Sequence, residues 1–170
     1  MPQLHIIALF LLILSTTAHA DKAHVHGTGS LNVVIEKNQL TLSLELPLDA
    51  VVGFERPPRT AAERTALDNT ARILNDAATL FTPTPAAQCT VQAVRVNMPF
   101  RTAPKPGATD GHADIEAHVV FRCATPSALK GFETTLFTHF KRLYRIEVQR
   151  VGPAGQAAGR LTPKQPRLNW

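Results

Sequence analysis

The first 20 of the 170 residues contain no Asp, Glu, Lys or Arg. Residues 6–14 form an unbroken apolar run, and the small and polar residues 15–20 (STTAHA) follow, which is the pattern of an export signal with a small-x-small cleavage site. The run is shorter than the roughly 20 residues that span a bilayer, and no cysteine follows it to carry a lipid. We therefore predict cleavage after Ala20 and a periplasmic chain over 21–170 with no stable membrane span; an uncleaved anchor is the alternative.

Several signatures of catalysis and nucleotide binding are missing from the sequence. It contains no nucleophile elbow, no phosphate-binding P-loop and no G-x-G-x-x-G. The net charge of +5 is modest, and its basic residues are spread along the chain instead of forming one patch. Nucleic acid is therefore not an expected partner; contact with an anionic envelope surface, or solubility alone, explains the charge more simply.

The chain has only two cysteines, Cys89 and Cys123, and neither belongs to a C-x-x-C motif. Export would place both in an oxidising compartment, where an even number of cysteines favours a disulfide. Such a bond would close a loop of about 35 residues and contribute about 3–4 kcal/mol through its effect on chain entropy. The alternative is a zinc site in which both thiolates are ligands.

The hydrophobic pattern predicts an α+β fold in a single domain, with a mostly antiparallel sheet and two helices. The first helix begins at the capping box Thr60–Glu63 and has an apolar stripe of Leu67, Ala71, Leu74 and Ala78. The second helix is predicted over 126–140. Composition predicts a mobile loop over 101–111, and residues 162–170 form a tail that contains Pro163 and Pro166. The predicted strands cover residues 30–37, 39–46, 89–96, 112–123, 143–151 and 157–161.

Five histidines lie beyond the predicted signal, and four of them fall in two short segments. His24 and His26 are two residues apart, so an extended backbone points both to one side. In the strand 112–123 the odd positions are apolar and include Cys123, which predicts that they face the core. The even positions then form a polar row of His112, Asp114, Glu116 and His118.

Imidazole and carboxylate ligands suit Zn²⁺, with Cu²⁺ and Ni²⁺ as competitors. If the two segments are neighbouring strands, His24, His26, His112 and one of Asp114 or Glu116 would complete a four-coordinate zinc site. His118 lies farther along and could bind a second ion, whereas His139 is expected at a helix end or in the core. The alternative is that the even row is simply the solvated face of a half-exposed strand.

Four motifs, in this order and spacing, resemble the ZrgA-like family of periplasmic zinc-binding proteins. They are HVHG at 24–27, LNVVIE at 31–36, VGFERPP at 52–58, and HADIE at 112–116 continuing to FRC at 121–123. The resemblance implies a non-enzymatic accessory protein that binds zinc and assists its uptake, beside an ABC-type zinc importer or its binding protein. It also implies that His24, His26 and His112 are ligands, that Asp114 or Glu116 assists them, and that Cys89 and Cys123 are bridged.

Two departures from the family pattern stand out. Arg56 occupies a position where the family usually has a histidine, so a ligand could be missing here. Residues 101–111 lack the long His/Asp-rich insert of many members and hold a single acid, Asp110.

Two other classes of function stay open. A non-metal envelope interaction module would use the strand face and the basic tail to bind a protein or an anionic partner. A metalloenzyme would need a general base near the metal, and Glu116 and Glu55 are the candidates; Glu55 has a simpler expected role as an ion-pair partner of the adjacent Arg56.

Overall fold

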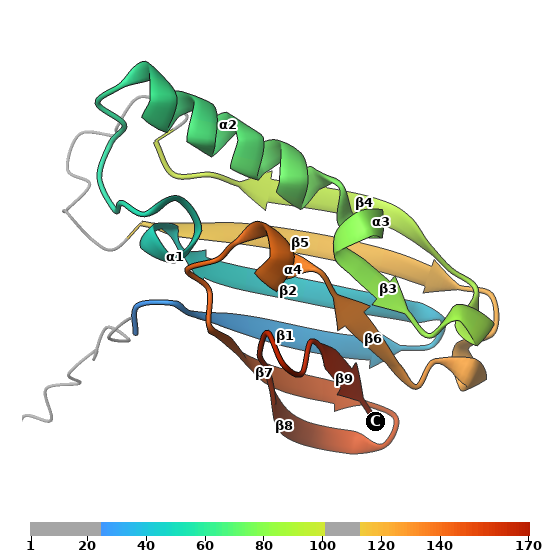
Figure 1. The fold of residues 1–170 in the computed structure, drawn as a ribbon. Helices are drawn as coiled ribbons and strands as arrows, with labels where there is room; N and C mark the ends of the chain where they lie inside the picture. The colour runs from blue at the N-terminus through green and yellow to red at the C-terminus, as the bar shows by residue number, and fades with distance from the viewer. Residues whose placement is uncertain (1–24, 101–112) are drawn as a thin grey trace, which may run out of the picture.

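The computed structural model describes residues 25–100 and 113–170. Its main feature is a six-stranded sheet with the strand order β4-β5-β2-β1-β7-β8 (Figure 1). The strands of this sheet are β1 (Thr28–Glu36), β2 (Gln39–Pro47), β4 (Cys89–Asn97), β5 (Asp114–Cys123), β7 (Arg145–Gly152) and β8 (Gly155–Leu161). A second sheet has the order β3-β6-β9 and consists of β3 (Phe81–Pro83), β6 (Gly131–Thr134) and β9 (Arg167–Asn169).

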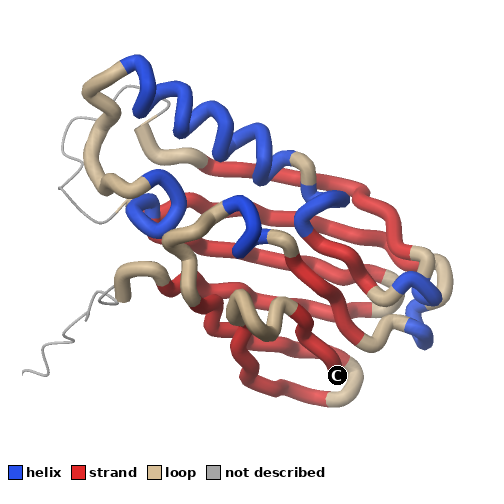
Figure 2. The backbone as a smooth tube through the Cα atoms, viewed as in Figure 1, coloured by secondary structure: helices blue, strands red, loops and turns tan. Residues whose placement is uncertain are grey.

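The helices and the small sheet lie on one side of the large sheet, as the backbone trace shows (Figure 2). The helical segments are α1 (Leu48–Val52), α2 (Ala61–Asn75), α3 (Ala77–Leu80), α4 (Leu136–His139) and the 3-10 turns η1 (Pro85–Ala87) and η2 (Pro126–Ala128). The predicted mixture of helices with a mostly antiparallel sheet is confirmed, although the described residues form four α-helices where two were expected. The pairing of β1 with β7 is parallel, since the second half of the chain crosses over to reach that edge of the hairpin.

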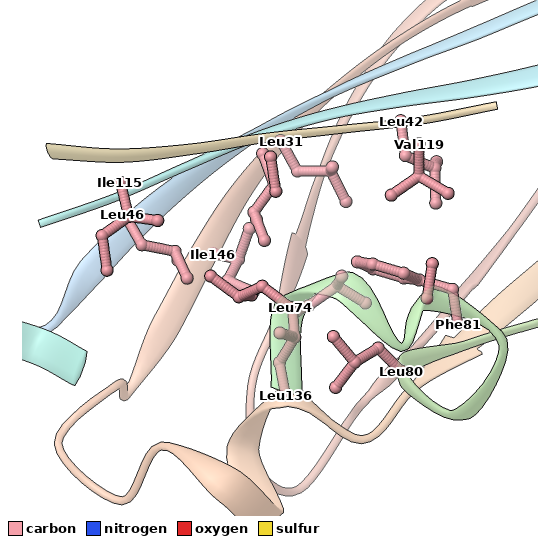
Figure 3. Packing of buried hydrophobic residues seen from close by; sticks show 14 of the residues in the cluster. Leu31, Leu42, Leu46, Leu74, Leu80, Phe81, Ile115, Val119, Leu136 and Ile146 are labelled. Atoms are coloured by element: carbon pink, nitrogen blue, oxygen red, sulfur yellow. The ribbon is translucent and has the colours of Figure 1, made fainter. Parts of the chain in front are cut away.

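The core lies between the large sheet and this covering layer. Alternate residues of the hairpin β1–β2 point inward, and Leu31, Leu42 and Leu46 are fully buried. The odd positions of β5 are buried as predicted, from Ile115 to Cys123. Side chains from the sheet meet side chains of α2, α3, β3 and α4 in one cluster, including Leu74, Leu80, Phe81 and Leu136 (Figure 3).

The first predicted helix is confirmed, with one change at its end. Thr60 accepts a hydrogen bond from the Glu63 N–H, and the Glu63 side chain accepts one from the Thr60 N–H, which is the predicted capping box. Helix α2 ends at Asn75, and a separate helix, α3, begins at Ala77. The buried positions of α3 do not continue the apolar stripe of α2. Ala78 is therefore exposed, in contrast to the prediction, while Ala77 and Leu80 are buried.

The second predicted helix, over 126–140, is wrong. The segment contains only η2, strand β6 and the single turn α4. Its central part pairs on one side with β3 and on the other with β9, so the 162–170 tail also has structure that its composition did not predict. Phe132 of β6 packs against Phe81 at 5.9 Å and Trp170 at 6.3 Å between ring centroids. Tertiary pairing thus overrides the helical spacing of the apolar residues.

Cys89 and Cys123 lie directly opposite each other in β4 and β5 and form a disulfide. The predicted bond is confirmed, and the alternative of two zinc-binding thiolates is excluded. The predictions for the signal 1–20, the whole loop 101–111, His24 and His112 concern positions outside the described residues. Within the described part of the chain, no helix is both long enough and apolar enough to cross a membrane.

Removing the disulfide should destabilise the protein without changing its fold. The bond joins residues 34 apart, and the entropy of the unfolded loop accounts for about 3–4 kcal/mol. We expect the double variant Cys89→Ser/Cys123→Ser to lose about that much free energy of unfolding in urea, with the wild-type circular dichroism spectrum retained. Wild type measured under reducing conditions is the matched control. Equal unfolding free energies for oxidised wild type and the double variant would contradict the assignment.

Candidate metal centre

Three chain segments meet at one end of the large sheet. β2 runs antiparallel to both β1 and β5, so the start of β1, the end of β2 and the start of β5 lie at the same end, on the left of Figure 1. In the register, Ser30 lies opposite Glu45, and Pro47 lies opposite Asp114. The ligand set predicted from the sequence required β1 and β5 to be neighbouring strands. They are not neighbours, because β2 lies between them.

The residues after β2 fill the space between the two strand starts. Pro47, which has no N–H for the ladder, ends β2, and α1 begins at once with Leu48 and Asp49. The Leu48 N–H donates to the Ala113 carbonyl at 2.9 Å, which holds α1 against the start of β5. Gly53 ends α1 with a left-handed φ of 88°, and the chain then turns toward Glu55.

His26 approaches this helix from the other side. It lies in a turn closed by the Thr28 N–H, which donates to the Val25 carbonyl at 2.9 Å. The His26 Nδ1 atom is 2.6 Å from Asp49 Oδ2. The His26 side chain is 79% exposed and that of Asp49 only 13%, so the pair has one solvent-facing and one sheltered member.

Glu55 completes a group of three potential ligands. One nitrogen of His26 and one carboxylate oxygen each of Asp49 and Glu55 all lie within 4.8 Å of one another. Over residues 25–100 and 113–170 no other three His, Cys, Asp or Glu side chains meet in this way. Asp49 Oδ1 is buried and accepts no hydrogen bond from any described residue. One imidazole and two carboxylates form a ligand set that suits Zn²⁺.

The structure separates the ligands that the sequence suggested. His26 belongs to the group, while Asp114 lies one strand away, opposite Pro47. Glu116 and His118 do face the polar side of β5 as predicted, but they line a hollow on the open face of the sheet and do not join His26. His139 is exposed at the end of α4, which confirms a helix-end position.

The hollow has a volume of about 440 Å³ and a mixed polar lining. The His118 Nδ1 atom lies 3.1 Å from the Ser43 hydroxyl, and Glu116 accepts a hydrogen bond from the Asn97 amide at 3.4 Å. Arg95 lies opposite His118 in the register and adds a cation to the same hollow. Glu45 lies opposite Glu116 and lines the same hollow. Glu45, Glu116 and His118 nevertheless do not form a close group of three potential ligands among the described residues, so they occur as an ordinary polar sheet face.

Asp49 was not identified from the sequence, and Glu55 was considered only as an ion-pair partner or a base. The one available signal for Asp49 is its place two residues after Pro47, at the end of a predicted strand. That signal becomes informative only when the strand order is known, because the order decides which other segment ends reach the same place.

Arg56 occupies the position where the family usually has a histidine, and it forms contacts with protein side chains. Its guanidinium donates to both oxygens of Glu63 at 2.7 and 3.1 Å and lies over the Phe54 ring at 5.4 Å. The acidic partner that the structure shows for Arg56 is thus Glu63 at the start of α2, and Arg56 also donates to the Pro57 carbonyl at 3.2 Å. Hydrogen bonds from Arg56, and from the Arg59 N–H, lower the pKa of Glu63 to about 2. The pair fixes the segment that carries Glu55 to the beginning of α2.

This contact predicts how stability depends on pH. Because the pKa of Glu63 is lower in the folded state, its ionised form stabilises the protein above the ordinary glutamate range, and this contribution is lost as pH falls toward about 2. We expect Glu63→Gln to lower the urea midpoint at pH 7, to have a smaller effect at pH 3, and to have the smallest effect near pH 2. Exposed Glu36→Gln is the control. A pH-independent difference between wild type and Glu63→Gln would contradict this account.

Comparison with known proteins places the chain in a family. Residues 23–170 match the family described as ZrgA family zinc uptake protein. No curated protein matches the chain. The match covers the whole sheet, the covering layer and the three potential ligands, and it confirms the resemblance that the short motifs suggested. On this ground the chain belongs to the ZrgA family of zinc uptake proteins.

Proposed function

We propose that this protein binds Zn²⁺ reversibly in the periplasm, at the group of His26, Asp49 and Glu55, and passes it on during zinc uptake. The observation that carries the proposal is the meeting of these three side chains, with 2.6 Å between His26 Nδ1 and Asp49 Oδ2. Membership of a zinc uptake family supports zinc as the cargo. Cu²⁺ and Ni²⁺ are competitors at a site of this composition.

The distances fit a direct hydrogen bond between two of the ligands in the absence of metal. Ligands around a tetrahedral Zn²⁺ lie about 2.0–2.2 Å from the ion, which sets neighbouring ligand atoms more than 3 Å apart. The direct contact between His26 and Asp49 would therefore open slightly when an ion enters. Binding would replace one charge-assisted hydrogen bond by two metal bonds, and the proton of the imidazole would be released.

Four-coordinate zinc needs at least one ligand more than these three. We propose that the fourth ligand is either His24 or His112, both of which the family resemblance implies as ligands. The support is the covalent chain: His24 precedes Val25 in the turn that carries His26, and His112 precedes Ala113, whose carbonyl is bonded to Leu48. In this proposal Asp49 and Glu55 take the acidic role that the sequence analysis gave to Asp114 or Glu116.

The exposure of the site favours delivery over permanent storage. His26 lies at the surface, so an acceptor can approach the ion directly. We propose binding and not catalysis as the role, and an ABC-type zinc importer or its binding protein as the acceptor. The rival interaction module would use the basic tail, but β8 and β9 pair within the two sheets, which gives the tail a role in the fold.

Zinc titration of the mature chain tests the proposal. We expect about one tightly held Zn²⁺ per chain, and a loss of affinity of at least about tenfold in His26→Ala and in Asp49→Asn, since each removes one ligand. His139→Ala and Glu116→Gln remove the same residue types elsewhere and should leave binding unchanged. Binding lost in Glu116→Gln but retained in Asp49→Asn would contradict the assigned site.

The affinity should also depend on pH. A protonated imidazole cannot bind metal, so the apparent zinc affinity should fall steadily as pH decreases through the range in which histidines titrate. Calorimetry in buffers of different ionisation enthalpy should show proton release on binding below pH 7. The His26→Ala variant should release fewer protons. A constant affinity from pH 7.5 to pH 5.5 would contradict ligation by imidazole.

A further inference from the structure

The segment between α4 and β7 lies against both halves of the candidate metal centre. Phe140 and Leu143 are buried in the core and fix its position, whereas Lys141, Arg142 and Tyr144 are exposed. The segment contributes none of the three ligands.

Its first contact is with the turn that carries His26. The backbone N–H of Tyr144 donates to the Gly27 carbonyl at 2.8 Å, and that of Arg145 donates to the same oxygen at 3.3 Å. Gly27 has a left-handed φ of 72°. A Cβ atom at this position would lie 2.8 Å from the Arg142 carbonyl oxygen and would collide with the Tyr144 ring. Only glycine therefore allows the His26 turn to lie this close to the segment.

Its second contact is with the helix that carries Asp49. The Arg142 Nε donates to the Asp49 carbonyl at 3.1 Å. The aliphatic part of the same side chain passes close to Gly53, at the end of α1. Arg142 thus binds the backbone of the potential ligand Asp49. Tyr144 and Arg145 bind the backbone of Gly27, the residue after the potential ligand His26.

We propose that Arg142 is a positioning residue of the zinc site, and that the segment Arg142–Arg145 acts as a clamp that keeps His26 and Asp49 at bonding distance. The inference rests on the proposed function, since it concerns the same ligands. It goes further because it assigns the site's geometry to residues that do not bind the ion. Losing such a supporting contact typically weakens metal binding by about 10–100-fold.

The test compares substitutions in the clamp with one beside it, on the mature chain 21–170. Arg142→Ala should weaken zinc binding by about 10–100-fold in a competition titration with a chromophoric chelator. Lys141→Ala removes the same charge from a neighbour that forms no hydrogen bond or ion pair with the described residues, and it should bind zinc like wild type. Arg142→Lys keeps a donor and should recover most of the affinity. Thermal midpoints should be the same in all four proteins.

A measurement without zinc separates this inference from the proposed function. In metal-free protein, Arg142→Ala should shift the His26 imidazole NMR signals, and Lys141→Ala should not. Gly27→Ala should shift the signal of the chain's single tyrosine after 3-fluorotyrosine labelling. Unchanged His26 signals and unchanged zinc affinity in Arg142→Ala, or equal losses in Arg142→Ala and Lys141→Ala, would overturn the clamp. The expected shifts without zinc binding in any variant would instead overturn the zinc site.

Discussion

The placement of β2 between β1 and β5 is the constraint on which the candidate centre depends. Because β2 runs antiparallel to both neighbours, it ends where they begin. The chain that leaves β2 therefore lies between the start of β1 and the start of β5. Pro47 ends the ladder there, and the short helix α1 turns Asp49 toward His26.

The residues around the candidate centre fix the backbone of the segments that carry the potential ligands, and make few contacts with the ligand side chains themselves. Arg56 binds Glu63 at the start of α2 and so fixes the segment that carries Glu55. Leu48 ties α1 to the start of β5, and Tyr144 ties the His26 turn to β7. The side chains that would meet an ion thus come from three separate segments, each anchored by a neighbouring residue. This arrangement leaves His26 exposed at the surface while Asp49 stays sheltered.

The sequence predicted what depends on local pattern. Alternation along 39–46 and 112–123 identified two central strands and their buried faces, and Thr60 with Glu63 identified the start of α2, because these signals are local. Prediction failed where the secondary structure depends on pairing with distant segments. Residues 126–140 have the apolar spacing of a helix, yet their centre forms a strand that pairs with β3 and β9. For the site, His26 was recognisable as part of a His-x-His pair. Asp49 was not, because an isolated acid after a strand acquires meaning only from the strand order.

The most direct test of the central claim is a crystal structure of zinc-loaded protein with anomalous diffraction measured at the zinc edge. The account predicts a strong anomalous peak between His26, Asp49 and Glu55, at the end of β2. A peak beside Glu116 and His118 on the open face of the sheet, with none at His26, would contradict it.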